Sequence, residues 1–277
     1  AVAPVGTPVP DLTYAFGPEL GVPALYPNGV GTAVRFDGSK DQRLLVADHA
    51  DINITNGPWE EMSWEFWFKP EKLPVVGESN TIYEQGGNTR GVHFYLSGTQ
   101  DSNPTEADLY LFAWNRAETW WGGTVGEVEG VTAVKSTVKL GSVYHVAFVM
   151  DGDPSGDLEG TLTGYLNGRQ VGQVSGVHLL YNHSDDIAFA YAAAQAVDHI
   201  TGDRGEQPGL GFTGVLDDAA FYDIALSAEQ VLEWTLDRFG DRTADRFDRL
   251  QQQPARDEAD DRHKQDNDDL EYLRDEL

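Results

Sequence analysis

The 277-residue chain is long enough for one large domain with an appendage or for two domains, and its seven Trp, eleven Tyr and twelve Phe suffice for a sizeable core. Its 46 acidic and 19 basic side chains give a net charge of −27, which excludes nucleic acid and anionic membrane surfaces as main partners. The absence of cysteine excludes disulfides, thiol catalysis and thiolate metal sites.

The first 31 residues contain six prolines and five glycines. Because proline cannot donate to a strand ladder, we expect an extended arm here without a ladder of its own. The chain begins at Ala1 without a methionine, which favours a processed N-terminus after an export signal. We therefore expect an exported protein, either extracellular or at the cell surface. Because the sequence contains no run of about 18 apolar residues, we expect no membrane insertion.

Short strands are predicted along the middle of the chain, because β-branched and aromatic runs alternate with Gly, Asn and Ser clusters. They cover residues 34–37, 43–47, 62–68, 81–84, 92–96, 108–114, 144–150, 162–166, 170–174 and 188–194. Within residues 62–68, period two places Trp64, Phe66 and Phe68 on one face and Trp67 on the other. Trp67 either packs beneath a loop or offers its ring to a sugar. His145 lies in a core-strand pattern and is expected to be buried and hydrogen-bonded.

The stretch from Gly211 to Gln230 is predicted to be the last strand of the sheet followed by a helix. Asp217 and Asp218 interrupt its apolar pattern, so these carboxylates require solvent, backbone amides or a hard cation. Ser227 and Gln230 have capping-box spacing, which predicts a short helix ending near Phe239.

Residues 241–277 differ in composition, with 13 acidic and 7 basic side chains and few large apolar ones. Acid-before-base pairs at i,i+4 spacing make helix plausible in this charged tail. It has too little apolar surface to fold alone, so docking on its own domain or on a partner is expected if it is ordered. We therefore divide the chain into an arm (1–31), one globular domain (32–240) and the tail (241–277).

Five stretches in order resemble one family: AVRFDG at 33–38, MSWEFWFKP at 62–70, YHVAFVMDG at 144–152, GYLNG at 164–168, and GVLDDAAFYDIALSAE at 214–229. They are similar to the laminin-G-like jelly rolls of the concanavalin A-like lectin/glucanase superfamily. The resemblance implies an all-β fold, a two-sheet antiparallel jelly-roll sandwich with a short C-terminal helix.

The same resemblance implies a structural calcium ion that links an early turn to the closing strand. By motif, its ligands would be Asp37, Gly38 and Asp217. Oxygen ligands from two distant segments would staple the sandwich together. The alternative is that Asp37 and Asp217 bond turn amides with no ion. The loop at 151–159 has EF-hand-like oxygens, but its twelfth position is Leu162 rather than Glu, so we predict a solvated hairpin loop.

Catalytic motifs are absent from the sequence. The Glu-x-Asp-x-x-Glu strand of many glucanases in the superfamily does not occur, and Glu60, Glu61 and Glu65 lack the intervening Asp. We therefore predict that the protein is not an enzyme, and a glycan-active enzyme is the less favoured reading.

A candidate ligand site consists of Trp114, Arg116, Trp120 and Trp121. Aromatic faces beside charged groups suit a sugar, whose apolar face stacks while its hydroxyls bond polar groups. The alternative is a tryptophan-rich loop that covers the core or a protein interface.

Two hypotheses of function follow. The first is a noncatalytic extracellular recognition module, adhesive or lectin-like, that binds glycan or protein and is stabilised by calcium. The second is a structural subunit of a larger extracellular assembly, docked through its N-terminal arm and its charged tail.

Overall fold

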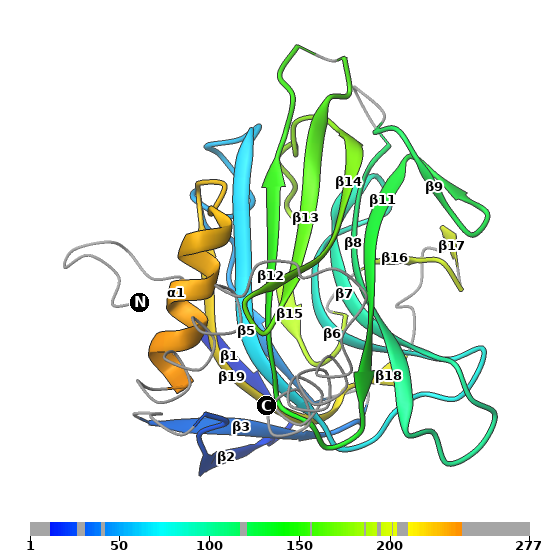
Figure 1. The fold of residues 1–277 in the computed structure, drawn as a ribbon, viewed down its shortest axis with the longest axis vertical. Coiled ribbons are helices and arrows are strands. Elements are labelled where there is room, and N and C mark those ends of the chain that lie inside the picture. The colour runs from blue at the N-terminus through cyan, green and yellow to red at the C-terminus, as the bar shows by residue number, and fades with distance from the viewer. Residues whose placement is uncertain are drawn as a thin grey trace, which may run out of the picture.

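The computed structural model describes residues 12–26, 31–39, 42–116, 121–155, 157–185, 187–192, 195–200, 202–203 and 210–239. Its strands form two large sheets that face each other, so the predicted jelly-roll sandwich is confirmed (Figure 1). The first sheet runs, in spatial order, through β1 (Leu12–Ala15), β4 (Arg43–Val46), β15 (Ile187–Phe189), β6 (Ser79–Gly86), β7 (Arg90–Gly98), β8 (Glu106–Asn115) and β11 (Val131–Lys139), with β18 (Leu210–Gly211) parallel to β6.

The second sheet runs, in spatial order, through β14 (Arg169–Val177), β13 (Gly160–Leu166), β12 (Tyr144–Asp151), β5 (Glu61–Pro70), β19 (Thr213–Tyr222), β3 (Thr32–Asp37) and β2 (Glu19–Pro23). Neighbouring strands along both orders are antiparallel. Two small ribbons, β9 (Thr124–Val125) with β10 (Val128–Glu129) and β16 (Val197–Asp198) with β17 (Gly202–Asp203), lie outside these sheets.

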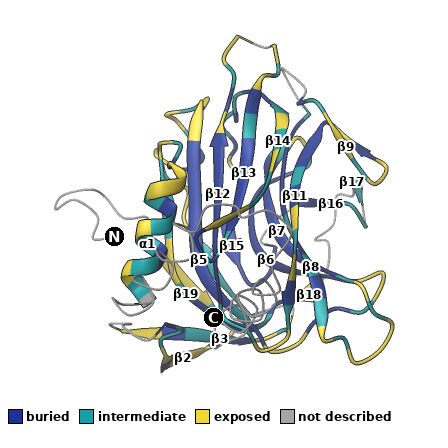
Figure 2. Cartoon of the chain, in the orientation of Figure 1, coloured by how far each residue is buried: buried dark blue, intermediate teal, exposed yellow. Residues whose placement is uncertain are grey.

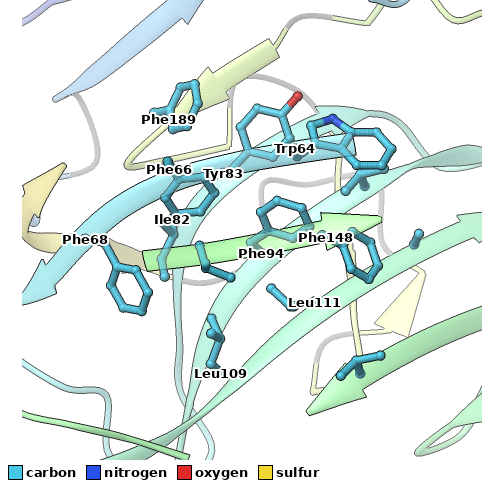
Figure 3. Packing of buried hydrophobic residues seen from close by; sticks show 14 of the residues in the cluster. Trp64, Phe66, Phe68, Ile82, Tyr83, Phe94, Leu109, Leu111, Phe148 and Phe189 are labelled. Carbon is cyan, nitrogen blue, oxygen red and sulfur yellow. The ribbon is translucent and has the colours of Figure 1, made fainter. Parts of the chain in front are cut away.

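The core lies between the sheets and is rich in aromatic rings (Figure 3). Trp64, Phe66 and Phe68 point into it from β5, as period two predicts, and each is at most 2% exposed. Rings from both sheets meet at centroid distances of 5.2–6.4 Å, as in the contacts of Phe94 with Trp64, Phe66 and Phe148. Burying rings of this size supplies most of the driving force for stacking the two sheets.

Both outer faces of the sandwich are partly covered. Helix α1 (Ala228–Phe239) packs on the second sheet, where Val231 and Leu226 meet Ala147, Val149 and Tyr165. The β9–β10 and β16–β17 ribbons lie on the opposite side, beside the first sheet (Figure 1). Figure 2 shows the resulting pattern, in which central strands are buried and exposed positions concentrate in loops and on one side of α1.

The predicted helix start is confirmed by its hydrogen bonds. The Ser227 N–H donates to Oε1 of Gln230 at 2.9 Å, and the Gln230 N–H donates to Oγ of Ser227 at 3.3 Å. This reciprocal capping box satisfies two backbone donors at the first turn.

Three expectations about the elements need correction. The N-terminal arm does carry ladders, because β1 pairs with β4 and β2 pairs with β3. Strand β11 was not predicted, although its valines and threonines have high β-propensity. The strand expected over 188–194 ends at Phe189, because Ala190 adopts a left-handed conformation with φ of 71°. The predicted tail, 241–277, lies outside the described residues.

Candidate functional site

The predicted calcium ligands do not meet in this fold. Asp37 pairs with Thr213 across β3 and β19, and Asp217 lies four residues farther along β19. At about 3.3 Å per residue this separates the two positions by ~13 Å, whereas calcium holds each oxygen at ~2.3–2.6 Å. Gly38 lies in the turn after Asp37 with a φ of 80°. The structure therefore does not bring these three residues together at one point.

Both carboxylates instead accept bonds from nearby donors. Oδ1 of Asp37 accepts the Ser39 N–H at 2.8 Å, and its Oδ2 accepts from the side-chain amide of Gln42 at 3.2 Å. Oδ2 of Asp217 accepts the Leu25 N–H at 3.0 Å. Within the described residues, no group of three His, Asp or Glu side chains could hold a metal ion.

The next residue, Asp218, fastens three segments together. It adopts a left-handed φ of 47° where the register between β19 and β5 shifts. Its Oδ2 accepts the Tyr26 hydroxyl at 3.1 Å and lies 2.7 Å from Nη2 of Arg238 on α1. Burial, aided by the Asp218 charge, raises the pKa of Tyr26 to about 12. This arrangement joins the helix and the segment after β2 to the sheet, so we assign it a structural role.

The tryptophan site predicted for a ligand is largely internal. Trp114 is fully buried and donates its indole N–H to the Gly87 carbonyl at 2.8 Å. Trp121 is 2% exposed and donates to the Leu179 carbonyl at 3.2 Å. Neither ring can stack on a sugar from solution in this structure, which favours the alternative that they pack in the protein. Arg116 follows β8 and is partly buried, and Trp120 lies outside the described residues.

Trp67 also proves to be structural. It is 2% exposed, and its ring packs between those of Tyr26 and His145 at centroid distances of 5.1 and 5.0 Å. His145 is buried and hydrogen-bonded, as predicted, with Nε2 located 3.2 Å from Oε2 of Glu65. Oε1 of Glu65 accepts the Tyr222 hydroxyl at 2.7 Å.

The best-placed candidate for binding is an aromatic group on the outer face of the first sheet, formed by Tyr95, Tyr110 and His199. Tyr95 on β7 and Tyr110 on β8 are paired in register, and their rings are parallel within 2° at 5.2 Å. His199 directly follows β16, and its ring stacks on the Tyr110 ring at a centroid distance of 4.3 Å. Tyr95 is buried, whereas Tyr110 and His199 are half-buried. We call these three residues the tyrosine–histidine cluster.

Polar side chains flank the tyrosine–histidine cluster. Nζ of Lys135 lies 6.0 Å from the Tyr110 ring centroid and 3.0 Å from Oδ2 of Asp108. The lysine side chain is 53% exposed, and the Asp108 side chain is 19% exposed. Ser97 places Oγ 3.5 Å from Nε2 of His199. A cation, a carboxylate and a hydroxyl therefore surround partly exposed rings.

The hydrogen bonds of Tyr95 orient the imidazole of His199. The Tyr95 hydroxyl accepts the backbone N–H of His199 at 3.2 Å and lies 2.8 Å from Nδ1. When this hydroxyl donates to Nδ1, the proton of the neutral ring lies on Nε2. Burial lowers the pKa of His199, although Asp198 and Asp108 partly oppose this effect. A neutral imidazole with its proton on Nε2, the nitrogen that faces Oγ of Ser97, is thus the favoured form at neutral pH.

This cluster was missed at the sequence level. Tyr95 and Tyr110 both fall in predicted strands, and their parity opposite Phe94 and Leu109 could have placed them on the outer face. His199 lies outside every predicted strand, and nothing in the neighbouring sequence indicates which strand it meets.

The family comparison agrees with this fold. A laminin G model of the concanavalin A-like lectin/glucanases superfamily matches residues 40–232. The chain belongs to that superfamily. No curated protein sequence matches it.

Solved structures similar to this superfamily member include three toxin binding domains. The binding domain of Paraclostridial Mosquitocidal Protein 1 has 15% identity and a TM-score of 0.52, with 82% of this chain and 47% of that chain covered. The botulinum neurotoxin serotype G binding domain has 10% identity and a TM-score of 0.54, with 82% of this chain and 46% of that chain covered. The binding domain of botulinum neurotoxin DC in complex with SialylT has 12% identity and a TM-score of 0.50, with 82% of this chain and 46% of that chain covered. At these identities the likeness shows the fold alone. The chain spans about half the length of these structures.

Two further observations concern membrane spanning and the acidic loop. None of the described helices has the length and apolarity needed to cross a bilayer. The loop between β12 and β13 is a hairpin connection, as predicted, in which Oδ1 of Asp153 accepts the Ser155 N–H at 2.8 Å.

Proposed function

We propose that this protein is a noncatalytic, exported recognition module that binds a glycan at the tyrosine–histidine cluster. The observation that carries the proposal is the stack of Tyr110 and His199, which remains partly exposed on a sheet whose neighbouring rings are covered. A sugar can place its apolar C–H face on such rings while its hydroxyls bond adjacent polar groups.

A hydrogen-bond donor and an acceptor for a sugar are available beside the cluster. Lys135 supplies an ammonium donor and Asp108 a carboxylate acceptor. Because Asp108 fixes Lys135 at 3.0 Å and Tyr95 fixes His199 at 2.8 Å, these groups are oriented before a ligand arrives. Orientation in advance reduces the entropy lost on binding.

The noncatalytic part of the proposal rests on how the neighbouring carboxylates are used. Glu65 is bonded to His145 and Tyr222 in a buried network, and Oε2 of Glu61 accepts the Ala225 N–H at 3.0 Å. These acids therefore support the fold rather than flank a glycosidic bond. Calcium is left out of the proposal, since Asp37 on β3 pairs with Thr213, four residues from Asp217 along β19.

Support for export comes from the laminin G-like family match and from the similarity in fold to a neurotoxin receptor-binding domain. The strongly negative net charge of −27 is compatible with a protein that stays soluble outside a cell.

A glycan array probed with the wild-type chain and with Tyr110→Ala tests the proposal. We expect the wild type to bind a defined set of glycans and Tyr110→Ala to bind them at least about tenfold more weakly, as for other central aromatic contacts. Tyr181→Ala is a matched control, because Tyr181 is also half-buried with a cation, Arg90, 5.9 Å from its ring. Equal loss in both variants, or no binding by the wild type, would contradict glycan recognition at this cluster.

A further inference from the structure

The N-terminal strands leave two sheet edges side by side. Among the strands that the structure describes, β1 pairs with β4 alone and β2 pairs with β3 alone. Only residues 16–18 separate these strands in the chain, so the edges of both sheets come close together at this point. A strand at a sheet edge presents backbone N–H and C=O groups to any extended chain that approaches.

Large apolar side chains are exposed at the same place. Leu12 and Tyr14 on β1 are 50% and 43% exposed, Phe16 in the connection is 66% exposed, and Leu20 on β2 is 55% exposed. Leu12 and Tyr14 are two residues apart and therefore lie on one face of the strand. We call these four residues the N-terminal apolar edge. A grouped apolar surface on a soluble protein is typical of an interaction site.

Strand β1 and the connection that follows it carry no charged side chains that would protect them from other strands. Residues 12–18 contain no Asp, Glu, Lys or Arg. On the opposite side of the sandwich, the edge strands β11 and β14 carry Lys135, Lys139 and Arg169. Proteins place charged residues on edge strands to prevent unwanted pairing, so among the described strands this difference marks β1 as the edge best suited to pair with a partner strand.

The surroundings of this edge favour a positively charged partner. Arg35 on β3 lies 3.0 Å from carboxylate oxygens of both Glu19 and Glu71, so one guanidinium faces two acids and a net negative charge remains. A second copy of the chain would bring another net charge of −27 to this surface, which disfavours self-association.

We propose that the N-terminal apolar edge docks an extended segment of another protein, in which apolar residues alternate with Lys or Arg. The segment adds a strand beside β1, places its apolar side chains against Leu12, Tyr14 and Phe16, and pairs its basic residues with Glu19 and neighbouring carboxylates. This surface is distinct from the tyrosine–histidine cluster, which lies on β7 and β8, so the two sites can be tested separately.

The test uses the full chain and a synthetic peptide of about ten alternating Lys and Val residues, a typical strand length. Hydrogen exchange read by mass spectrometry should show slower exchange at residues 12–15 when this peptide is added. A peptide of the same pattern with Glu in place of Lys should give no protection. The doubly substituted chain Tyr14→Lys, Phe16→Lys should bind the Lys–Val peptide at least about tenfold more weakly, whereas Gln173→Lys on the opposite edge strand β14 should bind as the wild type does.

Three results would overturn the proposal. The first is equal protection by both peptides, and the second is protection at β11 or β14 instead of β1. The third is a concentration-dependent dimer in sedimentation that the doubly substituted chain loses, since a second copy would then occupy the edge. Because all four side chains of the N-terminal apolar edge are at least 43% exposed, thermal unfolding of the substituted chains should match the wild type, and this measurement separates lost docking from lost folding.

Discussion

The Thr235 hydroxyl on α1 lies 2.9 Å from Nδ1 of His145 on β12. That hydroxyl donates its own proton to the Val231 carbonyl at 2.8 Å, so it accepts from Nδ1–H of His145. The other ring nitrogen faces Glu65 at 3.2 Å. Burial would raise the pKa of Glu65, but hydrogen bonds from His145 and Tyr222 hold it below its ordinary value. Helix α1 is therefore held on the sheet by a buried hydrogen-bonded pair of His145 and Glu65.

Substituting Thr235 tests how much its hydrogen bond with His145 stabilises the protein. In Thr235→Val the shape is kept, but Nδ1–H of His145 loses its buried acceptor, so we expect the free energy of unfolding to fall by about 1–3 kcal/mol. Urea unfolding measures this loss. Thr235→Ser retains the hydroxyl and should lose clearly less. If both variants lose the same stability, the missing methyl group rather than the hydrogen bond is responsible.

The Glu65 pair also predicts a dependence on acid. Its folded-state pKa lies below its ordinary value of 4.5, so its contribution is present above pH 4.5 and is lost as the pH falls through the folded-state pKa. Glu65→Gln lacks this contribution at every pH. We therefore expect the stability difference between wild type and variant to be largest near neutrality and to shrink in acid. Urea unfolding midpoints of both proteins, measured from pH 7 to about pH 3, test this expectation. A stability difference that stays constant over this range would contradict the interaction between Glu65 and His145.

A second buried histidine, His183, makes the stability depend on pH in a higher range than Glu65 does. Burial lowers the pKa of His183 from 6.5 to about 4, and Nε2 of this ring lies 3.1 Å from the side-chain amide of Gln85. Between these values the unfolded chain binds a proton that the folded chain does not, so stability falls as the pH drops from 6.5 to about 4. His183→Gln should show a flatter pH profile in this window. A wild-type slope that persists in the variant would assign the proton uptake to another group.

The two layers and the capping box were predictable, because period two in 62–68 and the Ser227–Gln230 spacing are local signals. The location of the site was not predictable in the same way. Trp114 and Tyr110 have the same parity on β8, yet Trp114 is buried and Tyr110 is half-exposed. The difference arises because Val197 and its neighbours cover only part of that face, and a strand pattern cannot report which distant segment covers it.

The spacing of the predicted calcium ligands was not predictable for a related reason. The resemblance names Asp37 and Asp217, but the register that separates them emerges only when β3 and β19 pair. The acidic turn and the closing strand are both present; Asp37 bonds Ser39 and Gln42 within its own turn, whereas Asp217 bonds the distant Leu25 N–H.

The separation of these acids leads to a double-mutant prediction. Asp37 lies opposite Thr213, ~13 Å from Asp217 along β19. Asp37→Asn and Asp217→Asn should therefore change the free energy of unfolding additively within about 0.5 kcal/mol. Their sum should be the same with added calcium and with a chelator. A non-additive effect of the two substitutions that appears only with added calcium would instead show that both carboxylates bind one calcium ion.

The central claim is that a glycan stacks on Tyr110 and His199. Backbone NMR of the labelled chain, titrated with a glycan that the array identifies, tests this claim most directly. We expect the largest shift changes at Tyr110, Lys135 and His199, with smaller ones at the buried Tyr95. Shift changes centred on another part of the surface, with these residues unaffected, would contradict binding at the tyrosine–histidine cluster.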